Sequence, residues 1–159
     1  IGIASNFQPH DITIVINISF SLKIYEAQTL LAPCEVAVKC VLPVVRAMIA
    51  KELMTKHKMK QLDVANLLDV SQSVVSLYGR KMRGRAIDLE AEEDITAMIN
   101  DMAASLAKGK MVYKDFITEL CEVCRIIRGK GLMCKLHKIF DPSIDIEKCE
   151  LCSAVMLKC

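Results

Sequence analysis

The stretch over residues 60–85 reads KQLDVANLLDVSQSVVSLYGRKMRGR and decides the fold. It holds two short helical periodicities, at residues 62–68 and 74–78, with a tight break between them. Ser71 precedes the second run, where a serine side chain caps a new helix well. Two helices joined by so short a turn must cross steeply, and the small side chain of Ala65 suits their contact. The stretch therefore predicts a helix-turn-helix, whose second helix offers its N-terminal side chains to the DNA major groove.

Polar and basic side chains occupy the positions of this motif that would meet DNA. Glutamine donates and accepts hydrogen bonds together, so Gln72 at the start of the second helix can bind adenine N6 and N7. Basic residues after the second helix would contact phosphates and set the salt dependence of binding. The alternative is a helical hairpin with a solvated basic loop, which would serve as a protein–protein adaptor. From the residues alone, the predicted DNA-binding set is Ser71, Gln72, Ser73, Ser76, Arg80, Lys81, Arg83 and Arg85.

The same stretch resembles the lambda-repressor/Cro-like (XRE-type) helix-turn-helix family. The matching small, apolar and glutamine positions are Gln61, Ala65, Val70, Gln72, Val75 and Tyr78. The turn position that is usually glycine holds Asp69, a residue type that tolerates left-handed backbone. The resemblance implies that Gln61 meets a DNA phosphate. From Ala32 to the late cysteines, the chain also looks like predicted archaeal transcriptional regulators that join such a motif to a cysteine-rich tail.

Composition and charge indicate what the chain can bind. Of the 159 residues, 53% are hydrophobic but only 4% are aromatic, which predicts an aliphatic, methionine-rich core. Residues 51–85 contain eight Lys/Arg and three Asp/Glu, whereas residues 86–120 contain three bases and eight acids. The basic block suits a polyanionic partner such as double-stranded DNA. No apolar run of about 18 residues and no secretory signal are found, so we expect a cytoplasmic protein with no membrane partner.

An alternating pattern over residues 12–24 predicts an N-terminal β-strand. Isoleucine, phenylalanine and leucine occupy every second position there, and only Val15 breaks the polar set between them. Because a single strand is not stable alone, we favour pairing with the same strand of a second copy, which would give a homodimer. The alternatives are a strand lying across helices and a segment that alternates by chance.

Three helical regions flank the motif. Residues 32–57 are apolar at three- and four-residue spacings, and Pro43 predicts a second piece starting near it. Cys34 and Cys40 lie in this apolar run and are predicted to be small core hydrophobes. Residues 87–106 and 112–128 are each expected to form one further helix.

The late cysteines form a metal-ligand pattern. A Cys-x-x-Cys pair lets two thiolates reach one ion, and a structural metal would stabilise a tail that has few apolar residues. Zinc is favoured; an iron–sulfur cluster, or disulfides and free thiols, are the alternatives. Either the four cysteines of the outer pairs make one site, or the first two pairs make one and the last cysteines contribute elsewhere. The predicted ligands are Cys121, Cys124, Cys134, His137, Cys149 and Cys152, with Cys159 last.

These patterns together predict a mostly α protein without enzymatic activity, since no catalytic motif is found. The expected regions are an N-terminal strand and dimerisation arm (1–31), a helix-turn-helix domain (32–85), a helical connector (86–128) and a cysteine-rich metal-binding tail (129–159) that also uses Cys121 and Cys124. The expected function is sequence-specific DNA binding as a transcriptional regulator. The alternative is a metal- or redox-sensing regulator whose cysteine cluster controls DNA binding.

Overall fold

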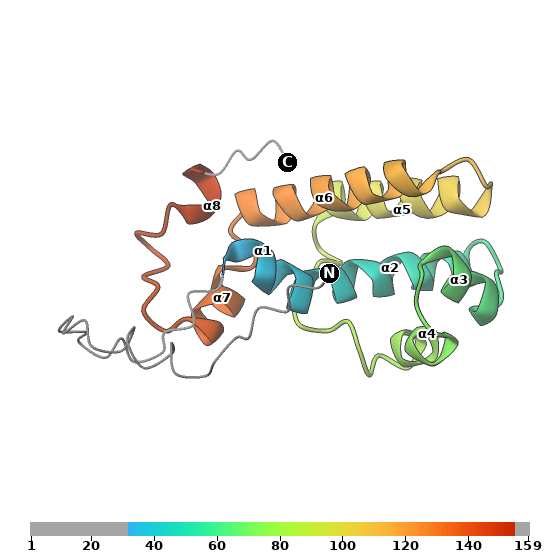
Figure 1. Cartoon of the computed structure of the whole chain (residues 1–159), viewed down its shortest axis with the longest axis horizontal. Helices are drawn as coiled ribbons and strands as arrows, with labels where there is room; N and C mark the ends of the chain where they lie inside the picture. The colour runs from blue at the N-terminus through green and yellow to red at the C-terminus, as the bar shows by residue number, and fades with distance from the viewer. Residues whose placement is uncertain (1–31, 155–159) are drawn as a thin grey trace, which may run out of the picture.

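The computed structural model describes the backbone of residues 32–154 and the side chains of residues 32–152. This part is mostly helical, as predicted (Figure 1). The predicted strand at residues 12–24 and Cys159 lie outside the described residues. Among those described, no helix combines the length and apolar character needed to cross a membrane. The elements are α1 (Pro33–Val36), the π-helical turn η2 (Ala37–Val41), α2 (Leu42–Thr55), α3 (Gln61–Leu67), α4 (Gln72–Gly79), α5 (Glu93–Ala107), α6 (Tyr113–Gly129), α7 (Cys134–Phe140) and α8 (Leu151–Ala154).

Helix α2 is the central element of the fold. It contacts α3, α4, α5 and α6, and α5 lies beside α6 in a second layer (Figure 1). Its buried residues are Val44, Val45, Ile49, Ala50 and Leu53. Burial of apolar surface from all these helices in one cluster drives their association. Among the described residues, Tyr78 and Phe116 are the only aromatic side chains in the buried core, so the predicted aliphatic core is confirmed for this part of the chain.

Pro43 lies in the first turn of α2, close to the predicted start of a second helical piece. A proline ring inside an α-helix pushes against the carbonyl four residues earlier and removes one hydrogen bond. Here the wider π-helical turn η2 comes directly before α2, so the chain stays helical from Pro33 to Thr55.

Helices α5 and α6 bury one stripe each, as their apolar spacing requires. On α5 the buried residues include Ile95, Ile99 and Met102, and on α6 they include Leu120 and Val123. Helix α5 begins six residues later than predicted, at Glu93 rather than at residue 87, because residues 86–92 form an irregular segment that buries Leu89.

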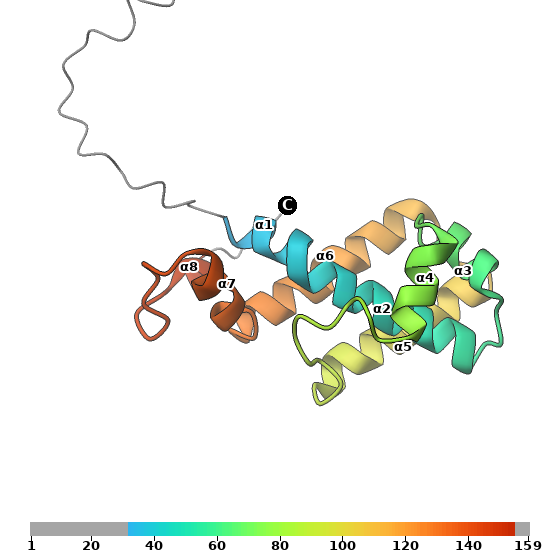
Figure 2. The same cartoon turned by 90° about the horizontal axis from the view of Figure 1, so that it is seen from below.

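Helix α7 falls in the region expected to be a cysteine-rich metal-binding tail. Its N-cap residue Met133 is buried in the main core, and Phe140 packs against the same core. Helices α7 and α8 lie at one end of the molecule, and α3 and α4 lie at the other (Figures 1 and 2).

Candidate nucleic-acid interface and thiol groups

The turn between α3 and α4 is held by backbone hydrogen bonds around Asp69. The backbone N–H of Val70 donates to the carbonyl of Ala65 at 3.0 Å, closing the helix end as in a Schellman motif. Asp69 itself has φ of +50°, the left-handed conformation that glycine adopts most easily. Helices α3 and α4 contact each other, and Figure 1 shows them as two short rods that cross.

Ser71 is the N-cap of α4, as predicted. Its Oγ accepts a hydrogen bond from the backbone N–H of Val74 at 3.4 Å and lies 2.8 Å from the Oγ of Ser73. Val75 and Tyr78 on the other face of α4 are buried in the core. The packing of this face turns the leading polar residues Gln72 and Ser73 outward, and both are exposed.

The remaining residues of the predicted DNA-binding set also reach the surface. Gln61 is the first residue of α3 and is exposed, while Ser76 is partly buried in the middle of α4. The four bases that follow α4 are all exposed: Arg80, Lys81, Arg83 and Arg85. The predicted glutamines and serines lie on or next to α3 and α4 at one end of the molecule (Figure 2), whereas the four bases lie on the segment that leaves α4 and crosses α2.

The basic segment after α4 is anchored against α2. Gly84 has φ of +72°, and a Cβ built on it would lie 2.5 Å from the Cβ of Ala47 and 2.6 Å from the carbonyl oxygen of Pro43. Arg85 Nη1 donates to the carbonyl of Lys81 at 3.2 Å. Leu89 is buried further along the same segment. We call residues 80–92 the basic strap, because this segment crosses α2 and carries the four exposed bases.

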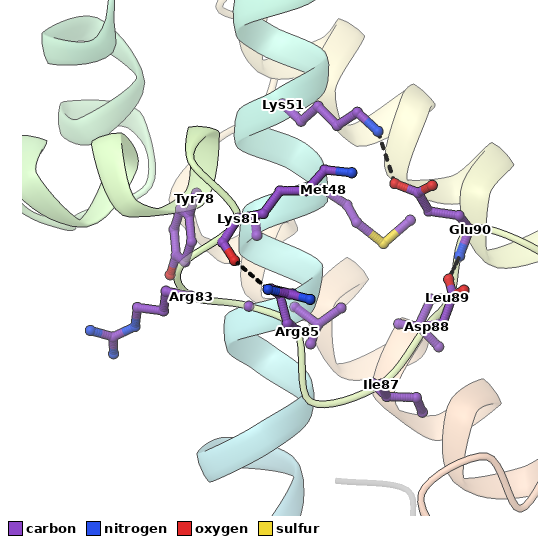
Figure 3. A pocket seen from close by; sticks show the side chains of 13 residues that line it. Met48, Lys51, Tyr78, Lys81, Arg83, Arg85, Ile87, Asp88, Leu89 and Glu90 are labelled. Atoms are coloured by element: carbon purple, nitrogen blue, oxygen red, sulfur yellow. Dashed lines mark hydrogen bonds and ion pairs between the residues drawn. The ribbon is translucent and has the colours of Figure 1, made fainter.

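A cavity of about 330 Å³ lies between the basic strap and α2 (Figure 3). Its apolar floor includes Val44 and Met48, and its rim includes four basic and two acidic side chains. Lys51 Nζ forms an ion pair with Glu90 at 2.8 Å across this rim, and the hydrogen bond from Lys51 is the main reason the pKa of Glu90 is lowered. Sequence patterns did not indicate this contact, because it joins residues that are far apart in the chain.

The strap bases point in different directions. Figure 3 shows Lys81 and Arg85 lying over α2 beside the cavity, whereas Arg83 extends away from it. The charge of Lys81 also contributes to lowering the pKa of Glu90, which places its ammonium group on the cavity side. Of Lys81, Arg83 and Arg85, Arg83 is therefore the base whose side chain points away from the cavity.

The predicted metal ligands separate into two groups of thiols. The pKa of Cys134 is raised, first by burial and then by the neighbouring thiols of Cys152 and Cys149. These three cysteines come from the start of α7, the loop before α8 and α8 itself. His137 is buried on α7, with 3% of its surface exposed. In the part of the chain described, no three His, Cys, Asp or Glu side chains lie close enough to hold a metal ion as they stand.

The second group of thiols consists of Cys121 and Cys124 on α6 and Cys34 on α1, and Cys34 was not among the predicted ligands. Burial is the main cause that raises the pKa of Cys124 to about 11; the thiols of Cys121 and Cys34 raise it further, and Arg128 and Arg46 oppose them. Arg128 Nη1 donates to the Sγ of Cys34 at 3.2 Å. The prediction that Cys34 is a core hydrophobe is wrong, because α1 leaves it exposed beside Arg128. Cys40 is half-buried.

The resemblance to the lambda-repressor/Cro-like family rests on residues of α3, α4 and the turn between them. Val64, Ala65, Val75 and Tyr78 are buried, while Gln61 and Gln72 are exposed. This pattern suits a helix pair that packs its apolar side against the core and exposes its polar side to solvent. Comparison with protein-family models, curated proteins and solved structures finds no match to this chain.

Proposed function

We propose that this protein binds double-stranded DNA in a sequence-specific manner and regulates transcription, with α4 as the helix that enters the major groove. The observation that carries the proposal is the exposure of Gln72 and Ser73 at the N-terminus of α4, directly after the Ser71 cap. A recognition helix contacts base edges with the residues of its N-terminal turn. The buried face of α4 fixes the direction in which these residues point.

Direct base contact is assigned to Gln72. Its amide can accept from adenine N6 and donate to adenine N7 at once, a pairing worth about 1–3 kcal/mol of discrimination against a wrong base. Ser73 and Ser76 lie on the same short helix and can add hydrogen bonds to either base type. Gln61, exposed at the start of α3, would meet the phosphate backbone, as the family resemblance implies.

Phosphate contacts are assigned to the basic strap. Arg83 extends away from the cavity, and Arg80 is exposed at the C-cap of α4. Lys81 and Arg85 complete the positive surface from the cavity side. The close packing of Gly84 on α2 stabilises one arrangement of these bases, so less entropy is lost when DNA binds.

A homodimer is part of the proposal. One short recognition helix makes few base contacts, and two copies would read a two-fold symmetric site with half-sites one helical turn apart, about 34–36 Å. The predicted arm at residues 1–31 would provide the dimer contact.

A second candidate function is metal or redox sensing by the cysteines. The observation that favours it is that Cys34 and Cys121 both raise the pKa of Cys124, and that Cys149 and Cys152 both raise the pKa of Cys134. Zinc suits thiolate donors, and an iron–sulfur cluster is the alternative. A metal at the first set would join α1 to α6, and a metal at the second set would join α7 to α8. Loss of the metal would then loosen these contacts and so affect DNA binding.

Fluorescence anisotropy with a labelled pool of double-stranded DNA, measured over a series of salt concentrations, tests DNA binding. We expect the logarithm of affinity to fall linearly with the logarithm of salt concentration. Replacing Arg80 and Arg83 by Ala should reduce the magnitude of that slope by about 2, roughly one per lost phosphate contact.

The matched control replaces Lys135 and Lys138, two exposed bases of α7 at the other end of the molecule. This control removes the same charge and should leave the slope unchanged. Absence of binding at low salt, or an equal loss in the α7 control, would contradict the proposal.

A further inference from the structure

We propose that the cavity between the basic strap and α2 binds a small organic monoanion, a carboxylate with a short apolar body. The volume of about 330 Å³ lies within the range of small-molecule sites in proteins. Helix α2 supplies most of the apolar lining, and the strap supplies most of the charged groups (Figure 3). The site lies apart from the cysteines and from Gln72, so it can be tested without metal and without DNA.

The strap is held at two points that line the cavity, so the shape of the cavity is fixed by the fold. At the first point, a Cβ built on Gly84 would lie 2.5 Å from the Cβ of Ala47 on α2. At the second point, Leu89 is buried in the core, with 1% of its surface exposed. The ion pair between Lys51 and Glu90 also joins α2 to the strap. A site with a fixed shape loses little conformational entropy when a ligand binds.

Two basic side chains beside the cavity have no acidic partner. Lys81 and Arg85 lie over α2 (Figure 3), and no carboxylate of the described residues is within ion-pair distance of either. Arg85 donates one N–H to the carbonyl of Lys81, which leaves the other N–H groups of its guanidinium for a ligand. A guanidinium can bind a carboxylate through two parallel hydrogen bonds. These two residues are therefore the groups that would hold the carboxylate.

The charge around the cavity favours a ligand with one negative charge over a ligand with two. Three bases lie beside the cavity, Lys51, Lys81 and Arg85, because the fourth base of the rim extends away from it (Figure 3). The carboxylates of Asp88 and Glu90 also line the cavity, so three positive and two negative charges leave a net charge of +1. A monoanion neutralises this charge. A dianion such as a phosphate monoester would place an uncompensated negative charge beside two carboxylates, which repel it.

The apolar body of the ligand would lie against α2. Val44 forms a buried part of the lining, with 3% of its surface exposed. Met48 and Ile87 pack against the core and are only partly buried, so each keeps apolar surface that a ligand can cover. A methionine side chain also adapts its shape to what it contacts. This lining and the two unpaired bases together select a molecule that carries both a charge and an apolar chain.

Occupation of the cavity should reduce DNA affinity, an expectation that rests on the proposed function. Lys81 and Arg85 are also assigned to DNA phosphates, and a bound carboxylate would neutralise part of their charge. Because the two binding events are linked, DNA should lower the affinity for the carboxylate by the same factor. The cavity would then serve as the effector site of the regulator.

Titration of the full chain with sodium hexanoate, at constant ionic strength and without DNA, tests the site. Carbon-labelled methionine methyl groups are observed by NMR, and Met48→Leu identifies the Met48 signal. We expect this signal to shift and to saturate with a dissociation constant of about 1 mM or lower, as is usual for so small a ligand. Hexanamide has the same chain without the charge and should bind at least about 10-fold more weakly, since it forms no charge-assisted hydrogen bond. Hexyl phosphate, a dianion, should also bind more weakly than hexanoate.

Matched variants locate the carboxylate. Arg85→Gln should weaken hexanoate binding by about 10–100-fold, as expected for loss of a hydrogen bond to a charged group. Lys81→Met should weaken it by about 10-fold and is the second variant should Arg85→Gln disturb the strap. Lys114→Met removes an exposed lysine of α6 that does not line the cavity, and it should leave the affinity unchanged. Far-ultraviolet circular dichroism checks that each variant keeps its helix content.

Equal affinities for hexanoate and hexanamide would overturn the proposal, as would the absence of a saturable shift of the Met48 signal. Unchanged hexanoate affinity in both folded variants, Arg85→Gln and Lys81→Met, would also overturn it. Tighter binding of hexyl phosphate than of hexanoate would contradict the preference for a monoanion. Because the titration contains no DNA, its failure leaves DNA binding standing, and failure to bind DNA leaves the carboxylate site standing.

Discussion

Two residues near the ends of α3 and α4 adopt backbone conformations that glycine would adopt more easily. Asp69 has φ of +50° and Lys81 has φ of +55°. Each follows a helix end that is closed by a hydrogen bond spanning five residues, from Val70 to Ala65 and from Met82 to Leu77. A non-glycine residue in this region costs roughly 1 kcal/mol. The turn at Asp69 therefore forms although its residue is not glycine, because the packing of α3 against α4 outweighs this cost.

Asp69→Gly should raise the free energy of unfolding by up to about 1 kcal/mol, since glycine adopts the left-handed conformation without strain. Urea unfolding monitored by circular dichroism measures the change. Asn66→Gly, inside α3, is the matched control and should lower stability by a few tenths of a kcal/mol because of helix propensity. Equal effects of the two substitutions would show that the turn is not strained.

At the scale of single residues, sequence reasoning predicted the helix cap and the exposed polar positions but missed Cys34. Ser71 caps α4 because capping depends on a residue and its next three neighbours, all adjacent in the chain. Cys34 was expected inside because it lies among apolar residues. Its true environment depends on Arg128, which is distant in the chain, so local periodicity carried no signal for it.

Among the elements, the basic strap depends on one glycine. Gly84→Ala places a Cβ against the backbone of Pro43 and forces a left-handed residue, so it should lower stability by about 2–4 kcal/mol. Gly109→Ala separates the two causes, because Gly109 has φ of +61° but nothing within 4 Å of an added Cβ. Gly109→Ala should lower the free energy of unfolding by about 1 kcal/mol, from backbone strain alone. Thermal and urea unfolding measure both, and a Gly109 variant as unstable as the Gly84 variant would argue against close packing of the strap.

The start of α5 is tied to the loop after α6 by Lys130. Its Nζ lies 2.6 Å from Asp94 and 2.8 Å from Glu92. The hydrogen bond from Lys130 is the main cause that lowers the pKa of Asp94 below its ordinary 3.8. A carboxylate with a lowered pKa stabilises the fold above its ordinary pKa, and that contribution is lost as pH falls through the lowered value. Because the pair is exposed, salt should weaken the effect.

Lys130→Met should raise the pKa of Asp94 toward 3.8. Carbon-detected NMR of the side-chain carboxyl group over a pH series measures it directly. Lys135→Met, an exposed base of α7, is the control and should leave Asp94 unchanged. A pKa of Asp94 that is the same with and without Lys130 would contradict the ion pair.

Helix type was more predictable than helix boundaries. The apolar stripes of α5 and α6 recur at helical spacing, so both helices were expected. The start of α5 was placed too early because acidic residues from Asp88 onward resemble a first helical turn. Burial of Leu89 in an irregular segment overrides that local preference.

For the whole molecule, the arrangement separates two kinds of chemistry. The exposed polar residues of α3 and α4 lie at one end, α7 and α8 lie at the other, and the basic strap crosses α2 (Figures 1 and 2). Helix α2 runs between them and contacts α4 as well as α6.

The three-dimensional grouping of the cysteines could not be derived from their spacing. Spacing alone left two ways to combine the three pairs, and the structure instead groups Cys134 with Cys149 and Cys152. Which pairs meet depends on how α6 and α7 pack against α1, and that is a long-range property of the core. The two short helices α3 and α4 were predictable because their determinants lie within 26 neighbouring residues.

The central claim, that α4 reads DNA bases, is tested most directly by selecting binding sites from random double-stranded DNA. The selection is carried out in parallel with the native chain and with Gln72→Ala. The native chain should enrich a two-fold symmetric sequence with a preferred adenine in each half-site. Gln72→Ala should lose that adenine preference, at a cost of about 1–3 kcal/mol per half-site, while the spacing between half-sites is kept. Identical preferences for both proteins would contradict the assignment of α4 as the helix that reads DNA.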